Sequence, residues 1–205
     1  MKRLKSGDII EIFLPAIKRY CYCKYIDKRK YQDSVSYPFQ LRLSSLLSTS
    51  KQELNNIDFS KLLFSPWHLT GHRKLVETGQ WKVIGNLQPN SADFIKHHYK
   101  MEWPPNLLAI PNQVKQWRVL KDIEDVNKGV LVNYEQCSHL EYTGNHGALN
   151  FELRILVEYL KIENRLRDID KTNWSKYEYI LFEQFSAIPI YINLEASKQG
   201  RLIEK

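Results

Sequence analysis

The chain has 205 residues, of which 43% are hydrophobic and 26% charged, an ordinary composition for a globular protein. No run approaches the roughly 20 apolar residues that a membrane-spanning helix needs, and the basic residues at the start precede no apolar signal region, so we expect a cytoplasmic protein. The formal net charge is +7, and residues 1–30 hold most of it, with nine basic and three acidic side chains.

The first 30 residues predict a β-hairpin. Over residues 8–14, Ile10, Ile12 and Leu14 alternate with Glu11, which predicts a strand, and Pro15 ends it. Residues 20–26 form a second β-prone run after a short connection. We therefore expect two antiparallel strands here.

The middle of the chain predicts short strands separated by turns. Ser50 and Glu53 have the spacing of a capping box and predict a short helix. A strand is expected to resume at residues 62–64 and lead to residues 67–69. Further strands are expected at residues 81–86, 113–120 and 129–132, with a turn around Gly79.

The pattern becomes helical near residue 145. Apolar side chains at helical spacing predict a helix whose buried stripe is Leu149, Leu153, Leu156, Val157 and Leu160, and whose wet face is Glu152, Glu158, Lys161 and Arg165. Thr172 or Asn173 is expected to cap a second helix, with Trp174, Tyr177 and Leu181 on one face. Residues 188–192 contain Pro189, so they predict an edge strand or an extended arm. We expect a mobile tail from Glu195 onward.

Strands followed by helices indicate an α+β fold. We expect a single domain over residues 1–205, with residues 1–135 mainly β, residues 136–194 mainly helical with a terminal extended segment, and a tail over 195–205. The strand-rich part should form a small bent sheet or barrel, with the C-terminal helices packed on it.

The sequence offers little catalytic chemistry. His68 and His72 lack the glutamate of a zinc-binding helix motif, so we expect no metal. Cys137 and His139 are close only in sequence, and the three cysteines have no framework spacing, so we expect reduced thiols and no catalytic dyad. We accordingly expect no catalytic residues, no cofactor and no enzymatic activity.

Three segments resemble the immunity protein 26 family. Residues 7–15 (GDIIEIFLP), followed by residues 19–24 (RYCYCK), are similar to the family's opening, although Cys23 stands where glycine is usual. Residues 61–65 (KLLFS) and residues 79–86 (GQWKVIGN) resemble its central signature. Residues 137–141 (CSHLE), which precede a helix containing Arg154, resemble its C-terminal element. Together the three segments span residues 7–160 in family order.

The resemblance implies a bacterial, cytosolic antidote that binds a cognate toxin protein of a polymorphic or contact-dependent system and blocks it stoichiometrically. It also implies an SH3-like barrel. The signature residues are expected to be structural: Gly7, Asp8, Gly79, Trp81, Ile84, Gly85, Asn86, Leu140 and Glu141. In particular, Trp81 should lie in the core, and Gly79 and Gly85 with Asn86 should form turns that need a positive φ.

Tyrosines interleaved with cations mark a candidate partner-binding rim, because interface hot spots favour tyrosine, tryptophan and arginine. The rim comprises Tyr20, Tyr22, Lys24, Tyr25, Arg29 and Tyr31. The basic first 100 residues leave one alternative open, a nucleic-acid-binding or ribonuclease SH3-like barrel, whose binding would weaken steeply with salt.

Overall fold

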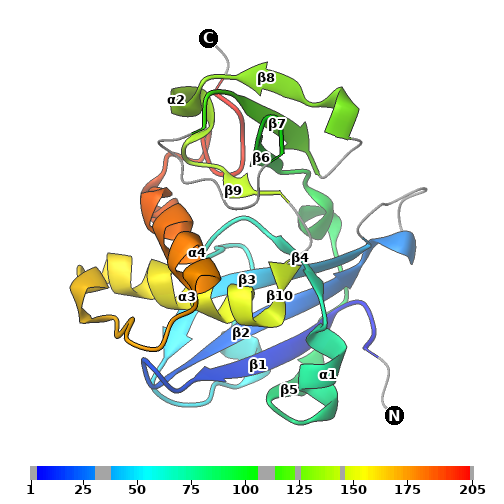
Figure 1. The fold of residues 1–205 in the computed structure, drawn as a ribbon. Helices are drawn as coiled ribbons and strands as arrows, with labels where there is room; N and C mark the ends of the chain where they lie inside the picture. The colour runs from blue at the N-terminus through cyan, green and yellow to red at the C-terminus, as the bar shows by residue number, and fades with distance from the viewer. Residues whose placement is uncertain (1–3, 31–37, 106–113, 123–125, 144–145, 204–205) are drawn as a thin grey trace. The chain divides into compact units, whose positions relative to one another are not determined.

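A computed structural model describes residues 4–30, 38–105, 114–122, 126–143 and 146–203 of the chain. These residues divide into two compact units. The first unit is Met1–Ile95 with Asn145–Phe151, and the second is Lys96–Gly144 with Glu152–Lys205. Figure 1 labels the helices and strands of both.

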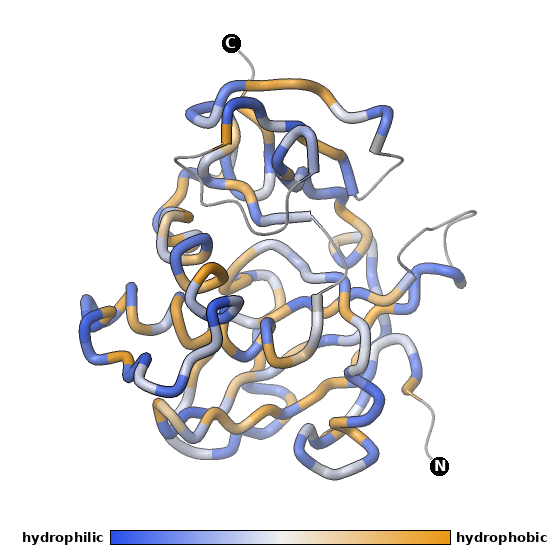
Figure 2. The backbone as a smooth tube through the Cα atoms, in the orientation of Figure 1, coloured by the Kyte–Doolittle hydropathy of each residue, from blue (hydrophilic) through white to orange (hydrophobic). Residues whose placement is uncertain are grey.

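The first unit contains a six-stranded sheet in the order β10-β4-β3-β2-β1-β5. Its strands are β1 (Asp8–Leu14), β2 (Arg19–Asp27), β3 (Phe39–Ser48), β4 (Trp67–Thr70), β5 (Trp81–Asn86) and β10 (His146–Gly147). The predicted hairpin is confirmed, because β1 and β2 pair antiparallel from Ile9 opposite Lys24 to Leu14 opposite Arg19. Lys18, in the connecting turn, has φ 52°. Most of β1 is hydrophobic (Figure 2).

Between these strands lie one short α-helix, α1 (His72–Glu77), and three 3-10 turns. The turns are Lys28–Lys30, Leu54–Asn56 and Ser91–Phe94. The helix expected after Ser50 is wrong, because the short turn begins only at Leu54 and Ser50 does not cap it. The strand expected from residue 62 onward starts later than predicted. Leu62 makes a single bridge to Ser44, and the strand β4 starts at Trp67.

Aromatic side chains fill the core of the first unit. Trp67, Trp81 and Phe64 are buried, and the ring of Phe151 lies 5.7, 6.0 and 5.8 Å from theirs. Large rings bury large apolar areas and gain further from tilted and edge-on contacts. The position predicted for Trp81 is therefore the one observed.

The second unit contains a four-stranded sheet in the order β8-β7-β6-β9. Its strands are β6 (His98–Glu102), β7 (Trp117–Lys121), β8 (Val130–Val132) and β9 (Glu141–Tyr142). Its helices are α2 (Tyr134–Cys137), most of α3 (Ala148–Ile162) and α4 (Lys176–Ala187), with 3-10 turns at Val126–Lys128, Leu166–Asp168 and Tyr191–Asn193. Trp117, Leu140 and Tyr142 belong to its buried hydrophobic cluster.

The helix α3 is where it was predicted, but its buried side chains differ from the predicted stripe. Leu149 is 73% exposed, whereas Glu158, expected on the wet face, is fully buried. Glu158 can be buried because the guanidinium of Arg154 lies 2.8 Å away and the ammonium of Lys161 2.9 Å away. A buried carboxylate needs such partners.

The helix α4 begins two or three residues later than predicted. Ser175, rather than Thr172 or Asn173, caps it, and its hydroxyl accepts from the Glu178 amide at 3.2 Å. Tyr177 is 44% exposed, whereas Leu181 is buried, so the two side chains do not share the buried face.

The C-terminal segment is folded rather than extended. The run after α4 forms the turn Tyr191–Asn193 in place of the expected strand or arm. Farther on, the Gly200 carbonyl accepts from the His98 amide at 2.8 Å, and the Arg201 carbonyl lies 2.7 Å from Nε2 of His139. These bonds connect residues 200–201 to β6 and to His139.

The fold class is α+β, as predicted, with a strand-rich N-terminal part and helices toward the C-terminus (Figure 1). Among the described strands both sheets are open, so the bent-sheet form of the prediction applies and the closed barrel does not. None of the described helices is both long enough and apolar enough to cross a membrane.

Candidate functional site

The structure separates the six residues of the predicted rim. Tyr22, Lys24 and Tyr25 are buried, so the expectation of an exposed rim is not met at these three positions. Tyr20 is half-buried and Arg29 is exposed, while Tyr31 lies outside the described residues. Tyr20 and Asp27 are seven residues apart on β2, which is about 23 Å along a strand. Tyr20 and Arg29 therefore lie near opposite ends of β2.

Lys24 is buried because it belongs to an internal ion network. Its ammonium lies 2.6 Å from Asp93 and also donates to the Gln88 carbonyl at 3.2 Å. Arg42 approaches the other oxygen of the same carboxylate at 3.1 Å. The carboxylate of Asp93 is held in place as part of a capping box with Asn90. This network is structural and presents no charge to a partner.

Tyr20 lies beside two other partly exposed side chains. Its ring is 4.9 Å from the ring of Phe13, which is 44% exposed, and the ammonium of Lys51 lies 5.9 Å from its centroid.

A second group of side chains lies beyond Asp27, the last residue of β2. We call it the arginine–aromatic patch, and it consists of Arg29, Phe39 and Arg73. The guanidinium groups of Arg29 and Arg73 lie 4.6 and 5.3 Å from the centroid of the half-buried Phe39 ring. Arg29 is anchored by two bonds to the carboxylate of Asp27, at 2.9 and 2.7 Å, and its side chain remains 46% exposed. Arginine is enriched in interface hot spots, and an aromatic ring attracts a guanidinium placed over its face.

Strand register explains why these residues meet. Phe39 pairs with Asp27 across β2 and β3, which places its ring beneath the arginine that Asp27 holds. Gln40 pairs with His68 across β3 and β4, so that α1, which begins at His72, starts close to Phe39. The sequence pattern did not reveal Phe39 or Arg73, because neither belongs to a motif and they are distant in the chain.

Two buried rings pack against Phe39 of the patch. The rings of Tyr25 and His72 lie 5.9 and 5.8 Å from that of Phe39. Burial, reinforced by Asp27, raises the pKa of Tyr25 to about 12, although Arg73 and Arg29 act in the opposite sense. Burial and the charge of Arg73 lower the pKa of His72. Both rings are therefore neutral near pH 7, and the positive charge of the patch comes from its two arginines.

Most of the signature residues hold the first sheet together. Gly7 has φ 93°, and its amide donates to the Tyr25 carbonyl at 2.7 Å. The carboxylate of Asp8 accepts from the side chain of Asn86 at 2.9 Å, which joins the first turn to the end of β5. Ile84 packs with other apolar side chains around Ile9.

The two remaining glycines of this region have different roles. Gly79 follows α1 and has φ 77°, as predicted for a turn glycine. Gly85 lies within β5, is not among the positive-φ glycines, and faces the Leu54 side chain, which would be 2.9 Å from an added Cβ. Its expected role in a positive-φ turn is thus wrong, since close packing explains the glycine instead. A register shift at Ile9 and Ile10 lies opposite this position.

Leu140 and Glu141 belong to the interior of the second unit. Leu140 is fully buried in the hydrophobic cluster, and Glu141 accepts two bonds from Arg154, at 2.6 and 3.1 Å. Arg154 also reaches Glu158, so a single buried guanidinium joins β9 to α3.

The chemistry available to the described residues is limited. Burial raises the pKa of Cys137 to about 11, so its thiol stays protonated near neutral pH. Burial has the opposite effect on His139, whose pKa it lowers. Nε2 of His139 bonds to the Arg201 carbonyl. Cys21 and Cys23 are buried free thiols. Within the described ranges, no three His, Cys, Asp or Glu side chains are grouped to hold a metal ion.

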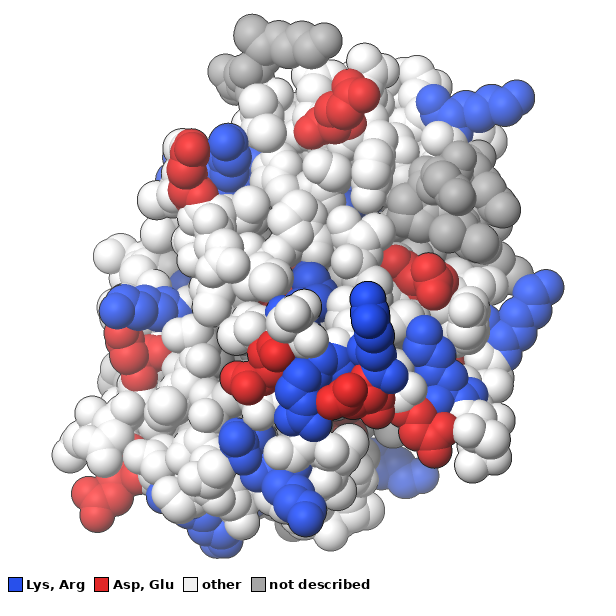
Figure 3. Space-filling view, turned by 90° about the vertical axis from the view of Figure 1, so that its left-hand side faces the viewer, with Lys and Arg blue, Asp and Glu red and all other residues white. Residues whose placement is uncertain are grey.

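Much of the basic charge of the opening segment is withdrawn from the surface. Lys24 and Lys28 are 3% and 1% exposed, and Arg29 is paired with Asp27. On the face of the molecule drawn in Figure 3, Lys and Arg side chains lie among Asp and Glu side chains. Among the described residues of that face, charges of both signs are mixed, unlike the continuous positive field that follows a nucleic-acid backbone.

The described residues thus combine buried ion clusters, an exposed arginine–aromatic patch and buried thiols. The model of the family described as immunity protein 26 matches residues 5–106, and the chain belongs to this family. The match covers the first two segments of the resemblance, whereas residues 137–141 and Arg154 lie beyond it and their likeness stays a prediction. No curated protein and no solved structure matched the chain.

Proposed function

We propose that this chain neutralises a cognate bacterial toxin by binding it stoichiometrically and covering a surface that the toxin needs. Membership of the immunity protein 26 family implies an immunity protein of a toxin system, hence a toxin partner and a non-enzymatic role. The mechanism proposed here, blocking by contact, requires a rigid exposed surface rather than reactive groups.

The observation that carries this proposal furthest is the arginine–aromatic patch. Phe39 is supported by buried rings, and Arg29 is fixed by Asp27, so both are ordered before a partner arrives. Such preorganisation reduces the entropy that is lost on binding. The patch also lies within the residues that match the family.

The test is a binding titration against the toxin encoded beside this chain. Arg73→Ala and Arg29→Ala remove exposed side chains, so folding should be retained, and each should raise the Kd by at least about tenfold if it is a hot spot worth about 1.4 kcal/mol or more. The matched control is Lys82→Ala, which removes an exposed cation on β5 of the same unit. If both arginine variants bind as the control does, the patch is not the contact surface. If the unmodified protein neither binds nor protects against the toxin, the proposed function fails.

The alternative of a nucleic-acid-binding barrel has less support, since the described sheets are open and two lysines of the opening segment are buried. A salt titration distinguishes the two functions, because binding through phosphates weakens steeply between 50 and 200 mM salt, by roughly 10³-fold or more for six phosphate contacts.

A further inference from the structure

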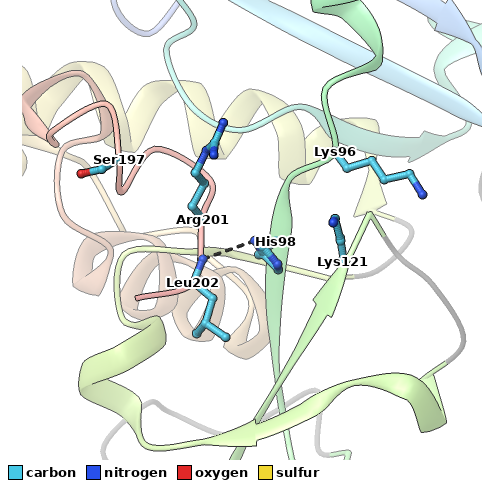
Figure 4. A pocket seen from close by; sticks show the side chains of 6 residues that line it. All are labelled: Lys96, His98, Lys121, Ser197, Arg201 and Leu202. Atoms are coloured by element: carbon cyan, nitrogen blue, oxygen red, sulfur yellow. Dashed lines mark hydrogen bonds between the residues drawn. The ribbon is translucent and has the colours of Figure 1, made fainter. Parts of the chain in front are cut away.

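The second unit contains a basic pocket, which Figure 4 shows from close by. Its volume is about 550 Å³, and it is lined by Lys96, His98, Lys121, Ser197, Arg201 and Leu202. His98 comes from the first residue of β6 and Lys121 from the last residue of β7, while the last three come from the segment after α4. A volume of this size falls within the range of small-molecule sites.

The lining is cationic. Lys96, Lys121 and Arg201 carry positive charges, and none of the lining residues is acidic. Lys121 and Arg201 are exposed, and neither forms an ion pair within the described part of the chain. The positive charges of Lys121 and Arg201 beside one hollow repel each other, and an anion held between them would relieve that repulsion.

Backbone hydrogen bonds fix the wall that carries Arg201. The His98 amide donates to the Gly200 carbonyl at 2.8 Å, and the Leu202 amide donates to Nδ1 of His98 at 3.3 Å, the bond drawn in Figure 4. His139 holds the Arg201 carbonyl at 2.7 Å. Gly200, with φ 64°, allows the chain to turn here. The pocket wall is thus preorganised around the arginine.

The same bond defines the hydrogen-bonding character of His98. Because Nδ1 accepts from the Leu202 amide, the proton of a neutral ring lies on Nε2, which makes this nitrogen a donor. The pocket therefore combines ammonium, guanidinium, imidazole and hydroxyl donors. Such donors suit the several acceptor oxygens of a phosphate, whose oxygens an arginine can bind two at a time.

We propose that this pocket binds a phosphate group, either as inorganic phosphate or as a phosphate monoester. A dianion matches the two charges of Lys121 and Arg201, whereas a single carboxylate would leave one of them uncompensated. Only Lys96 and His98 of the lining fall within residues 5–106, so the site lies largely outside the family match.

Isothermal titration with inorganic phosphate, at constant ionic strength against chloride, tests the proposal. We expect saturable binding with a Kd of about 1 mM or tighter, since several charge-assisted hydrogen bonds would form. The double variant Lys121→Ala/Arg201→Ala should weaken binding at least tenfold. The control is Lys115→Ala/Lys128→Ala, which removes the same charge from exposed positions of the same unit.

The remaining outcomes are also decisive. Tighter binding of 5′-AMP than of phosphate would assign the site to monoesters, and equal binding would assign it to the phosphate group alone. Absence of saturable binding, or an equal loss in the control variant, would overturn the proposal. Binding of a tetra-aspartate peptide without binding of phosphate would overturn it too, and would identify a site for acidic peptides.

Discussion

The buried guanidinium of Arg154 provides a sharp test of how the second unit is stabilised. Arg154 is 0% exposed and makes three bonds to carboxylates, two to Glu141 and one to Glu158. Replacement by alanine removes all three and leaves two buried carboxylates near a cavity. Breaking a buried ion pair from one side typically costs about 3–5 kcal/mol, so Arg154→Ala should lower the free energy of unfolding by about that amount.

Urea unfolding followed by tryptophan fluorescence measures this loss. The matched control is Arg165→Ala, because Arg165 and Asp168 form an ion pair at 2.7 Å whose side chains are about half exposed. The two pairs have similar distances and differ in burial, so the control should change stability little. Arg154→Lys keeps the charge but loses the forked geometry, and it should fall between the two. If Arg154→Ala proves as mild as Arg165→Ala, the reasoning from burial is refuted.

The pH dependence gives a second readout of the same cluster. Burial alone raises the pKa of Glu158, but Arg154 and Lys161 outweigh burial, and the net shift is downward. A carboxyl whose folded pKa is lowered stabilises the protein above its unfolded pKa, about 4.3, and this contribution is lost as the pH falls through the folded value. The unmodified protein should therefore lose more stability below about pH 4 than Arg154→Ala does.

Three further predictions concern buried groups and backbone geometry. Burial lowers the pKa of Lys100 to about 8, so between pH 8 and 10 the unfolded chain binds the proton that the folded chain has released. Over that interval the stability of the unmodified protein, measured in urea, should rise by up to about 3 kcal/mol relative to Lys100→Met, and a flat difference would contradict the shift. Gly7→Ala places a Cβ 2.5 Å from the Leu87 carbonyl at φ 93°, so in thermal unfolding it should cost more than Gly79→Ala, which meets nothing within 4 Å and costs about 1–2 kcal/mol. Finally, the thiol of Cys137 should react with a disulfide reagent at pH 8 only after denaturation, and rapid reaction of the native protein would show that its burial is wrong.

The sequence predicted the elements whose signal is local. The alternation of Ile10 and Ile12 around Glu11 predicted β1, and the apolar spacing around Leu153 and Leu160 predicted α3, because each pattern reports a face that must be buried. Gly79 was recognisable as a turn residue because glycine readily adopts the positive φ that such a turn needs.

Long-range contacts limited the remaining predictions. Glu158 looks like a surface residue until Arg154 and Lys161 are brought to it, and Lys24 looks exposed until Asp93 folds over from 69 residues away. Tertiary partners can thus reverse the burial that residue type alone suggests.

The predicted rim had the same limitation. Tyrosines on neighbouring positions of β2 suggested one exposed surface, yet Tyr22 and Tyr25 are both core residues. Arg29 is exposed, and its guanidinium lies 4.6 Å from the ring of Phe39. The register of β2 and β3 places Phe39 opposite Asp27, and no local motif identifies it.

The most direct test of the central claim is a titration of toxin activity with the purified chain. If the protein acts only by covering its partner, inhibition of the adjacently encoded toxin should rise linearly and saturate at one equivalent, and toxin recovered from the complex by denaturation and refolding should regain full activity. Complete inhibition at a small fraction of an equivalent, or recovered toxin that stays chemically inactivated, would contradict the account and indicate catalysis.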